Sequence, residues 1–202
     1  MKQILIMIAG LVLIISCTNG TGKKGKKKQT SKEYLKQSDL ITFKPDTTVA
    51  YISLINSKNV DSLLGKNVMD RLVLKELPSS SVISSDLKQR FTFYFHPGSV
   101  KKEFSEFKVS YVHQKEKKEF VTTLKEFKTD SSIKIGMTMS DFKAIKGEPD
   151  SLVHGASTLF YYRIDTYKNA EFLKKYNMPI YDANYTFQKG YLHEFKFGFE
   201  YP

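Results

Sequence analysis

The chain has 202 residues, which is enough for one ordinary domain or two small ones. Its single cysteine excludes an intrachain disulfide, so the folded state has to depend on packing. The formal charge of +11 invites a nucleic-acid-binding function, but residues 18–36 alone hold seven lysines against one acid. The rest of the chain is only weakly basic, so the basicity is concentrated in that segment, and the export signal described next argues against a nucleic-acid partner.

The N-terminus has the pattern of a secretory signal. Lys2 precedes an apolar stretch from residue 4 to residue 15. A membrane span needs about twenty apolar residues, so this stretch is too short for one. Ile14, Ile15 and Ser16 then lead into Cys17, and this order resembles a bacterial lipobox. The resemblance implies a signal peptide over 1–16 and acylation of Cys17, with palmitate among the acyl chains. An acylated cysteine takes no part in thiol catalysis.

Residues 17–36 are predicted to form a lipidated, basic and disordered tether, because they are rich in Gly, Ser, Thr and Lys. Beside anionic lipid, each lysine would contribute about 1 kcal/mol to membrane binding. Two interpretations stay open: a second, electrostatic membrane contact, or a soluble spacer. The lysines that would contact the membrane are Lys23, Lys24, Lys26, Lys27 and Lys28.

Two stretches, 37–129 and 130–202, follow the same order of a short helix and then strands. Apolar residues three apart mark one helical face in each helix, namely Val60 and Leu63 in the first and Phe142 and Ile145 in the second. Alternating aromatic and polar residues then predict antiparallel strands with one covered face. The sequence therefore predicts an α+β fold of two tandem helix-plus-antiparallel-sheet modules, the second clearer than the first.

Turn and cap residues define the second module most clearly. Thr138 is placed to cap a helix, with Asp141 three residues later, and Gly147 and Pro149 are placed to end it. The closing hairpin has Gly190 in its turn. We predict a three-residue loop over 188–190, because it would pair Phe187 with Tyr191 and keep the aromatic residues on one face.

These residues resemble the SmpA/OmlA (BamE-like) lipoprotein domain. The resemblance rests on Ile135-Gly136-Met137-Thr138, on Asp141-Phe142, on Gly147-Glu148-Pro149 and on the closing segment from Tyr185 to Leu192. It covers 130–202 well and 37–129 only in degenerate form, and the tandem arrangement is similar to the β-lactamase inhibitor protein fold. The motif residues Gly136, Thr138, Asp141, Gly147, Pro149 and Gly190 are structural. BamE-like proteins help to assemble outer-membrane β-barrels, and inhibitor-type relatives block enzymes.

The sequence offers little that could carry catalysis. The four histidines have no close spacing, and a core or interface role fits each better than metal binding. No nucleophile or phosphate-binding motif occurs, so we expect no enzyme activity, no cofactor and no metal. Tyrosine is enriched at interfaces, which makes four tyrosines candidates for a binding surface, although each could instead pack under a helix. They are Tyr161, Tyr162, Tyr181 and Tyr185.

Together these patterns predict a lipid-anchored envelope lipoprotein that binds another protein without catalysis. By resemblance, its task would lie in outer-membrane assembly or maintenance, and its place at the periplasmic face of the outer membrane. Two alternatives stay open. One is an inhibitor or immunity protein that binds an enzyme or toxin, and the other is a periplasmic small-ligand-binding protein or enzyme.

Overall fold

The computed structural model describes residues 43–73, 77–96, 103–113, 120–168 and 170–200. All of them belong to one compact unit that runs from Leu35 to Pro202. The signal peptide predicted for 1–16, the lipidated Cys17 and the basic tether to residue 36 lie outside the described residues. The structure therefore bears on the two stretches that were predicted to fold.

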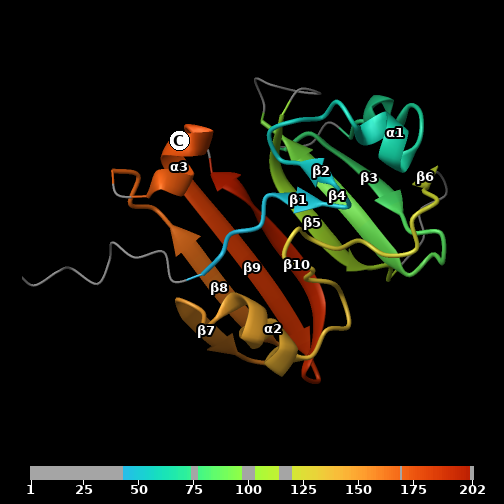
Figure 1. Ribbon diagram of the computed structural model, residues 1–202. Coiled ribbons are helices and arrows are strands. Elements are labelled where there is room, and N and C mark those ends of the chain that lie inside the picture. Colours follow the sequence, from blue (N-terminus) through green and yellow to red (C-terminus); the bar gives the residue numbers. More distant parts are fainter. Residues whose placement is uncertain (1–42, 74–76, 97–102, 114–119, 169, 201–202) are drawn as a thin grey trace, which may run out of the picture. The chain divides into compact units, whose positions relative to one another are not determined.

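One large β-sheet is the main element of the described chain (Figure 1). Its eight strands follow the order β6-β3-β4-β5-β10-β9-β8-β7, and every neighbouring pair is antiparallel except β3 and β6. The strands are β3 (Ser79–Ile83), β4 (Gln89–Phe95), β5 (Phe104–Tyr111), β6 (Phe120–Val121), β7 (Ser151–His154), β8 (Thr158–Ile164), β9 (Ile180–Gln188) and β10 (Tyr191–Glu200).

The remaining elements are short. Strands β1 (Thr48–Val49) and β2 (Ile52–Ser53) form a separate two-stranded sheet. The helices are α1 (Val60–Leu64), the 3-10 helix η2 (Val68–Asp70), α2 (Met139–Lys146) and α3 (Glu171–Tyr176). Helix α1 has only five residues, and its N-cap Asn59 makes no side-chain capping bond.

The predicted fold class, α+β with two tandem helix-plus-sheet modules, is wrong. The described chain is mostly β, with three short α-helices. Strand β5 from the first stretch pairs with β10 from the second over five consecutive residue pairs, from Glu106 to Ser110. Period-two alternation revealed the strands, but it could not show that the strands of both stretches hydrogen-bond into one sheet.

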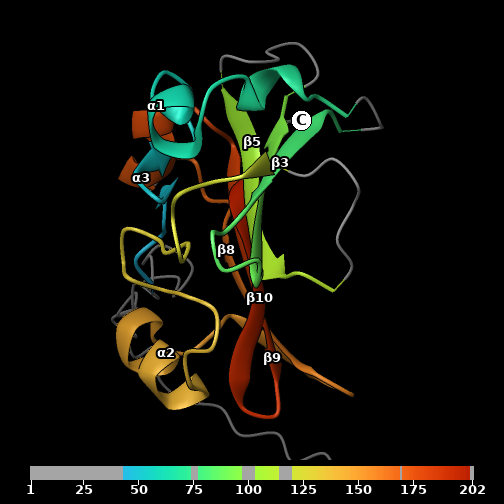
Figure 2. The same ribbon diagram turned by 90° about the vertical axis from the view of Figure 1, so that its right-hand side faces the viewer.

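The two faces of the sheet differ in chemistry. On one face, aromatic side chains alternate into the core, and Phe142 of α2 and Phe172 of α3 pack against them. Figure 2 shows α1, α2 and α3 on this one side of the sheet. The other face, called the open face below, carries the intervening polar and charged residues of β4, β5, β8, β9 and β10, and none of the described helices covers it.

The β9–β10 hairpin has a two-residue turn, and the predicted three-residue loop is wrong. Lys189 and Gly190 both have positive φ angles, 51° and 82°, and Tyr191 pairs with Gln188. This type of turn matches the right-handed twist of the two strands. It places Leu192 opposite Phe187 on the buried face, and a β-bulge at His193 then returns the aromatic residues of β10 to that face.

Helix α2 begins and ends where its sequence predicts. The Asp141 backbone N–H donates to Thr138 Oγ1 at 3.2 Å, which is the capping bond of a helix N-terminus. Gly147 follows the last helical residue with a φ of 77°, and its N–H donates to the Lys143 carbonyl. The resulting helix places Phe142 over the sheet and points the buried Lys146 inward.

Strand β7 is one edge of the sheet, and all four of its residues are exposed. Leu152 and Val153 are 39% and 59% exposed. The strand itself contains no charged residue and no proline, the features that usually protect a sheet edge.

Among the described residues, no helix is long and apolar enough to cross a membrane.

Candidate functional site

Three of the four tyrosines predicted to form a binding surface are core residues. Tyr162, Tyr181 and Tyr185 are fully buried, each on the aromatic face of the sheet. Their hydroxyl groups donate inward, Tyr162 to the Gly147 carbonyl at 2.9 Å and Tyr181 to the Asp46 carbonyl at 2.8 Å. Tyr161, one position along β8, points to the open face and is half-buried. Of the four predicted residues, only Tyr161 is placed to meet a partner.

The aromatic core contains a buried ion pair. Lys146 Nζ lies 2.6 Å from Asp46 Oδ2, and both side chains are 0% exposed. Lys146 also donates to the Lys44 carbonyl at 2.6 Å, and Asp46 Oδ1 accepts the Ser131 N–H at 3.1 Å. Tyr185 donates its hydroxyl to Asp46 Oδ2 at 3.3 Å. We call these groups, together with Asp130, the Asp46 cluster.

Burial and charge act against each other in the Asp46 cluster. Burial alone would raise the pKa of Asp46, but the Lys146 ammonium overcomes this effect and holds the pKa below its ordinary value. Burial lowers the pKa of Lys146, because desolvation outweighs the attraction of Asp46. Asp130 accepts the Thr47 N–H at 3.3 Å, and burial together with the neighbouring Asp46 carboxylate raises the pKa of Asp130. The cluster therefore holds a buried ion pair in which desolvation acts against both charges.

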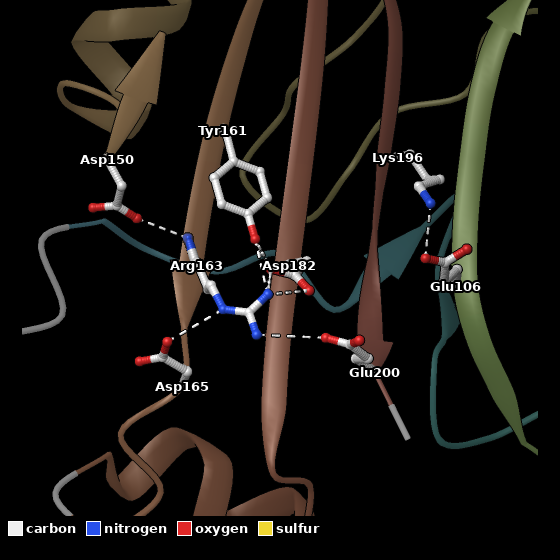
Figure 3. Close-up of polar contacts among 8 residues, drawn as sticks. All are labelled: Glu106, Asp150, Tyr161, Arg163, Asp165, Asp182, Lys196 and Glu200. Carbon is white, nitrogen blue, oxygen red and sulfur yellow. Dashed lines mark hydrogen bonds and ion pairs between the residues drawn. The ribbon is translucent and has the colours of Figure 1, made fainter. Parts of the chain in front are cut away.

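The open face carries a second polar network, which is centred on Arg163 of β8 (Figure 3). Its Nη1 donates to Asp182 Oδ1 at 2.9 Å and to the Tyr161 hydroxyl at 2.9 Å. Its Nε donates to Asp165 Oδ2 at 3.2 Å, and Nη2 lies 3.5 Å from Glu200 Oε2. Three neighbouring strands, β8, β9 and β10, therefore contribute to one arginine-centred group.

A loop residue, Asp150, also helps to fix the position of Arg163. Its backbone N–H donates to Asp150 Oδ2 at 2.7 Å, just beyond the point where β7 stops pairing with β8. The hydrogen bond to the Tyr161 hydroxyl raises the pKa of Arg163, and the carboxylates of Asp182 and Asp165 raise it further. Burial and the hydrogen bond to Asp182 raise the pKa of Tyr161. Arg163 therefore stays charged and Tyr161 stays neutral.

Two further ion pairs cross the seam between β5 and β10 on the open face. Lys196 and Lys108 lie directly opposite each other, which alone would be repulsive. Lys196 Nζ instead bonds Glu106 Oε1 at 2.9 Å, and Lys108 Nζ lies 2.9 Å from Glu194 Oε2. Gly198 makes this close approach feasible, because a Cβ atom there would lie 2.1 Å from the Ser105 carbonyl oxygen and 2.6 Å from Glu106 Cα.

This open face is suited to contact with another protein. Its charged side chains are partly exposed, Arg163 at 33% and Lys196 at 38%, so they can exchange partners without being pulled from the core. Single ion pairs of this kind contribute about 0–1 kcal/mol to stability. Arginine and tyrosine, however, are enriched among the residues that dominate binding energy at protein interfaces. Arg163 and Tyr161 stand together on β8, on the side of this surface that borders β7.

Two of the four histidines lie apart, and the other two come together in the fold although 80 residues separate them in the sequence. His96 is buried, and His154 is exposed on the edge strand β7. His113 and His193 stack with ring centroids 5.0 Å apart. Within the described ranges, no group of three or more His, Cys, Asp or Glu side chains is arranged to hold a metal ion.

Sequence reasoning missed Asp46, Lys146 and Arg163. Asp46 lies in a segment without periodicity, and Lys146 looks like an ordinary basic residue in the last turn of a helix. Arg163 did have a signal, since it alternates with Phe160, Tyr162 and Ile164 and so belongs to the opposite face. The same alternation in β9 indicated that Tyr181 and Tyr185 share one buried face.

Comparisons of the chain with protein-family models, with curated proteins and with solved structures found no match. The arrangement of side chains on the sheet is therefore the basis for a functional proposal.

Proposed function

We propose that the protein is a lipid-anchored envelope lipoprotein that binds another protein through the open face of its sheet, without catalysis. The observation that carries this proposal is the open face itself. It is a continuous surface over β5, β10, β9 and β8 in which partly exposed arginine, lysine, tyrosine and carboxylate groups are held by one another. The sequence features at Cys17 support an anchored location, and the lysine-rich residues 23–28 support contact with anionic lipid.

Site-specific photo-crosslinking in intact cells tests the binding surface. A photoreactive amino acid at Asn184 or Thr92 would lie on the open face, whereas one at Ser140 would lie on α2 on the covered side. We expect the two open-face positions to give the same crosslinked product and the Ser140 position to give none. A product from Ser140 alone, or from none of the three positions, would contradict the proposal.

Charge removal tests which side chains carry the binding. Arg163→Gln should reduce the yield of the crosslinked product, because arginine is a typical dominant contact whose loss costs about 2 kcal/mol or more of binding free energy. Lys174→Gln is the matched control, since Lys174 is also ion-paired, to Glu171 at 2.9 Å, but lies on α3. Equal effects of the two substitutions would point to general electrostatics and away from a defined surface.

A further inference from the structure

We propose that the side chains of Lys146 and Asp46 become joined by an intramolecular amide bond once the chain has folded. The geometry of the Asp46 cluster carries this inference. The amine nitrogen and a carboxyl oxygen lie 2.6 Å apart, and both side chains are completely buried. A second carboxyl group, that of Asp130, accepts the N–H of Thr47, the residue next to Asp46. The proposal does not depend on the binding function of the open face.

Both reacting groups are fixed in place by the fold. Lys146 is the last residue of α2, and its Nζ also bonds the Lys44 carbonyl at 2.6 Å. The carboxyl group of Asp46 is held by the Ser131 N–H on one oxygen and by the Tyr185 hydroxyl on the other. Fixing two reactants in this way makes their reaction effectively unimolecular and lowers the entropic part of the barrier.

The aromatic surroundings favour the amide over the ion pair. Phe43 packs on Tyr162 and Tyr181, and Phe142 packs on Tyr162 and Tyr185, so rings enclose the cluster. A buried ion pair retains a desolvation penalty on each charge. Replacing the pair by a neutral amide removes both charges from the core.

The reaction needs no cofactor and no oxidant. A proton passes from the Lys146 ammonium to the Asp46 carboxylate, and the neutral amine then attacks Cγ of Asp46. The Nζ–Cγ bond forms, the bond from Cγ to the hydroxyl oxygen breaks, and one water leaves. Asp130 is placed beside Asp46, because Asp130 Oδ1 accepts the Thr47 N–H at 3.3 Å and Asp46 Oδ1 accepts the Ser131 N–H at 3.1 Å. Its carboxyl group takes the proton that Nζ loses after the attack and gives it to the leaving oxygen. Asp130 is itself exposed, which gives the water a way out.

Mass spectrometry of the full chain under denaturing conditions tests the bond. We expect the intact mass to be lower than that of the unlinked chain by one water. Trypsin should then release residues 37–58 and 144–163 as one joined species, since Lys44 precedes proline and a bonded Lys146 resists cleavage. Separate peptides and a full intact mass would overturn the proposal, because they would show that the cluster holds an ion pair only.

Substitutions test whether the Lys146–Asp46 amide forms in the folded chain and which residue assists it. Lys146→Arg keeps a cation beside Asp46 but cannot form this amide, so its chain should show the full mass and separate peptides. Asp130→Asn should slow linkage by about a hundredfold or more in a time course after cell-free synthesis, because it removes a proton carrier. Asp86→Asn, at a surface turn remote in sequence from the cluster, is the control and should link at the wild-type rate. Linkage of Asp130→Asn at that same rate would overturn the assigned role of Asp130.

Discussion

At the scale of single residues, polar side chains form the hydrogen bonds that cap a helix and connect the sheet to neighbouring segments. Thr138 begins α2, and the hydroxyl groups of Tyr162 and Tyr181 connect the sheet to backbone carbonyls at Gly147 and Asp46. At these two positions the tyrosine ring packs in the core and its hydroxyl group reaches a backbone carbonyl. Tyr162 and Tyr181, two of the tyrosines considered for a binding surface, therefore make internal hydrogen bonds instead.

The capping bond of α2 gives a direct stability prediction. Thr138→Ala removes the acceptor of the Asp141 N–H, and we expect the free energy of unfolding to fall by about 1 kcal/mol. Urea denaturation followed by circular dichroism measures this change. Thr138→Ser keeps a capping hydroxyl and should remain close to wild type. An equal loss in both variants would show that the threonine methyl group matters more than the cap.

His193 predicts a dependence of stability on pH. Burial and the neighbouring His113 lower its pKa, while Glu194 acts in the opposite direction, and the Tyr111 ring also packs against it. The unfolded chain therefore binds a proton first as the pH falls through about 6.5, and the folded state loses stability. Buried His96 contributes in the same direction.

His193→Gln should therefore reduce the loss of unfolding free energy between about pH 7.5 and pH 5. Urea denaturation at the two pH values measures it. His154→Gln is the control, because His154 is exposed on β7, and it should leave the loss unchanged. A loss that is the same in both variants would exclude His193 as a contributor.

At the scale of elements, the pairing of β5 with β10 decides the architecture. Aromatic alternation predicted that both strands have one covered face, and the cap and stop of α2 were predicted at the correct residues. The pairing itself could not be predicted, since any strand with one apolar face satisfies the same pattern. The two-residue hairpin turn was missed for a related reason: the bulge at His193 corrects the register and leaves no sign in the alternation of apolar residues.

Gly198 tests the importance of this seam. A methyl group at position 198 would meet the β5 backbone at 2.1 Å, so Gly198→Ala has to push the two strands apart. We expect a loss of about 1–3 kcal/mol in unfolding free energy, together with weaker Lys196–Glu106 pairing. Gly155→Ala is the matched control, because the nearest atom to its added methyl group is 3.8 Å away. Equal stability of the two variants would contradict the close approach.

At the scale of the whole molecule, the sheet has one face committed to the core and one face left for contact. Sequence patterns identified the core face well, since its aromatic residues alternate along each strand. Tyr161 was among the candidate residues and Arg163 was not, although the alternation of β8 places both on the same face. The Asp46 cluster could not be predicted, because Asp46 and Lys146 are 100 positions apart and Asp46 lies in a segment without periodicity.

The unprotected edge at β7 predicts self-association at high concentration. Its exposed Leu152 and Val153 and its free backbone groups can accept another strand. Val153→Lys should reduce concentration-dependent growth of particle size, measured by light scattering, without changing the unfolding free energy by more than about 0.5 kcal/mol. Val153→Thr keeps a β-branched, uncharged side chain and serves as the control. If Val153→Lys associates as wild type does, pairing at this edge is not the cause.

The β-bulge at His193 also determines where the chain tolerates a change of length. Leu192 pairs with Phe187, and Glu194 pairs with the next residue back, Thr186, so His193 has no partner of its own across the hairpin. A chain that lacks His193 would keep every other pair and the facing of every other side chain. Loss of Lys196 would instead turn Phe197 and Phe199 out onto the open face. Position 193 of β10 can therefore be deleted without turning the other side chains to the opposite face. A deletion at position 196 does turn them.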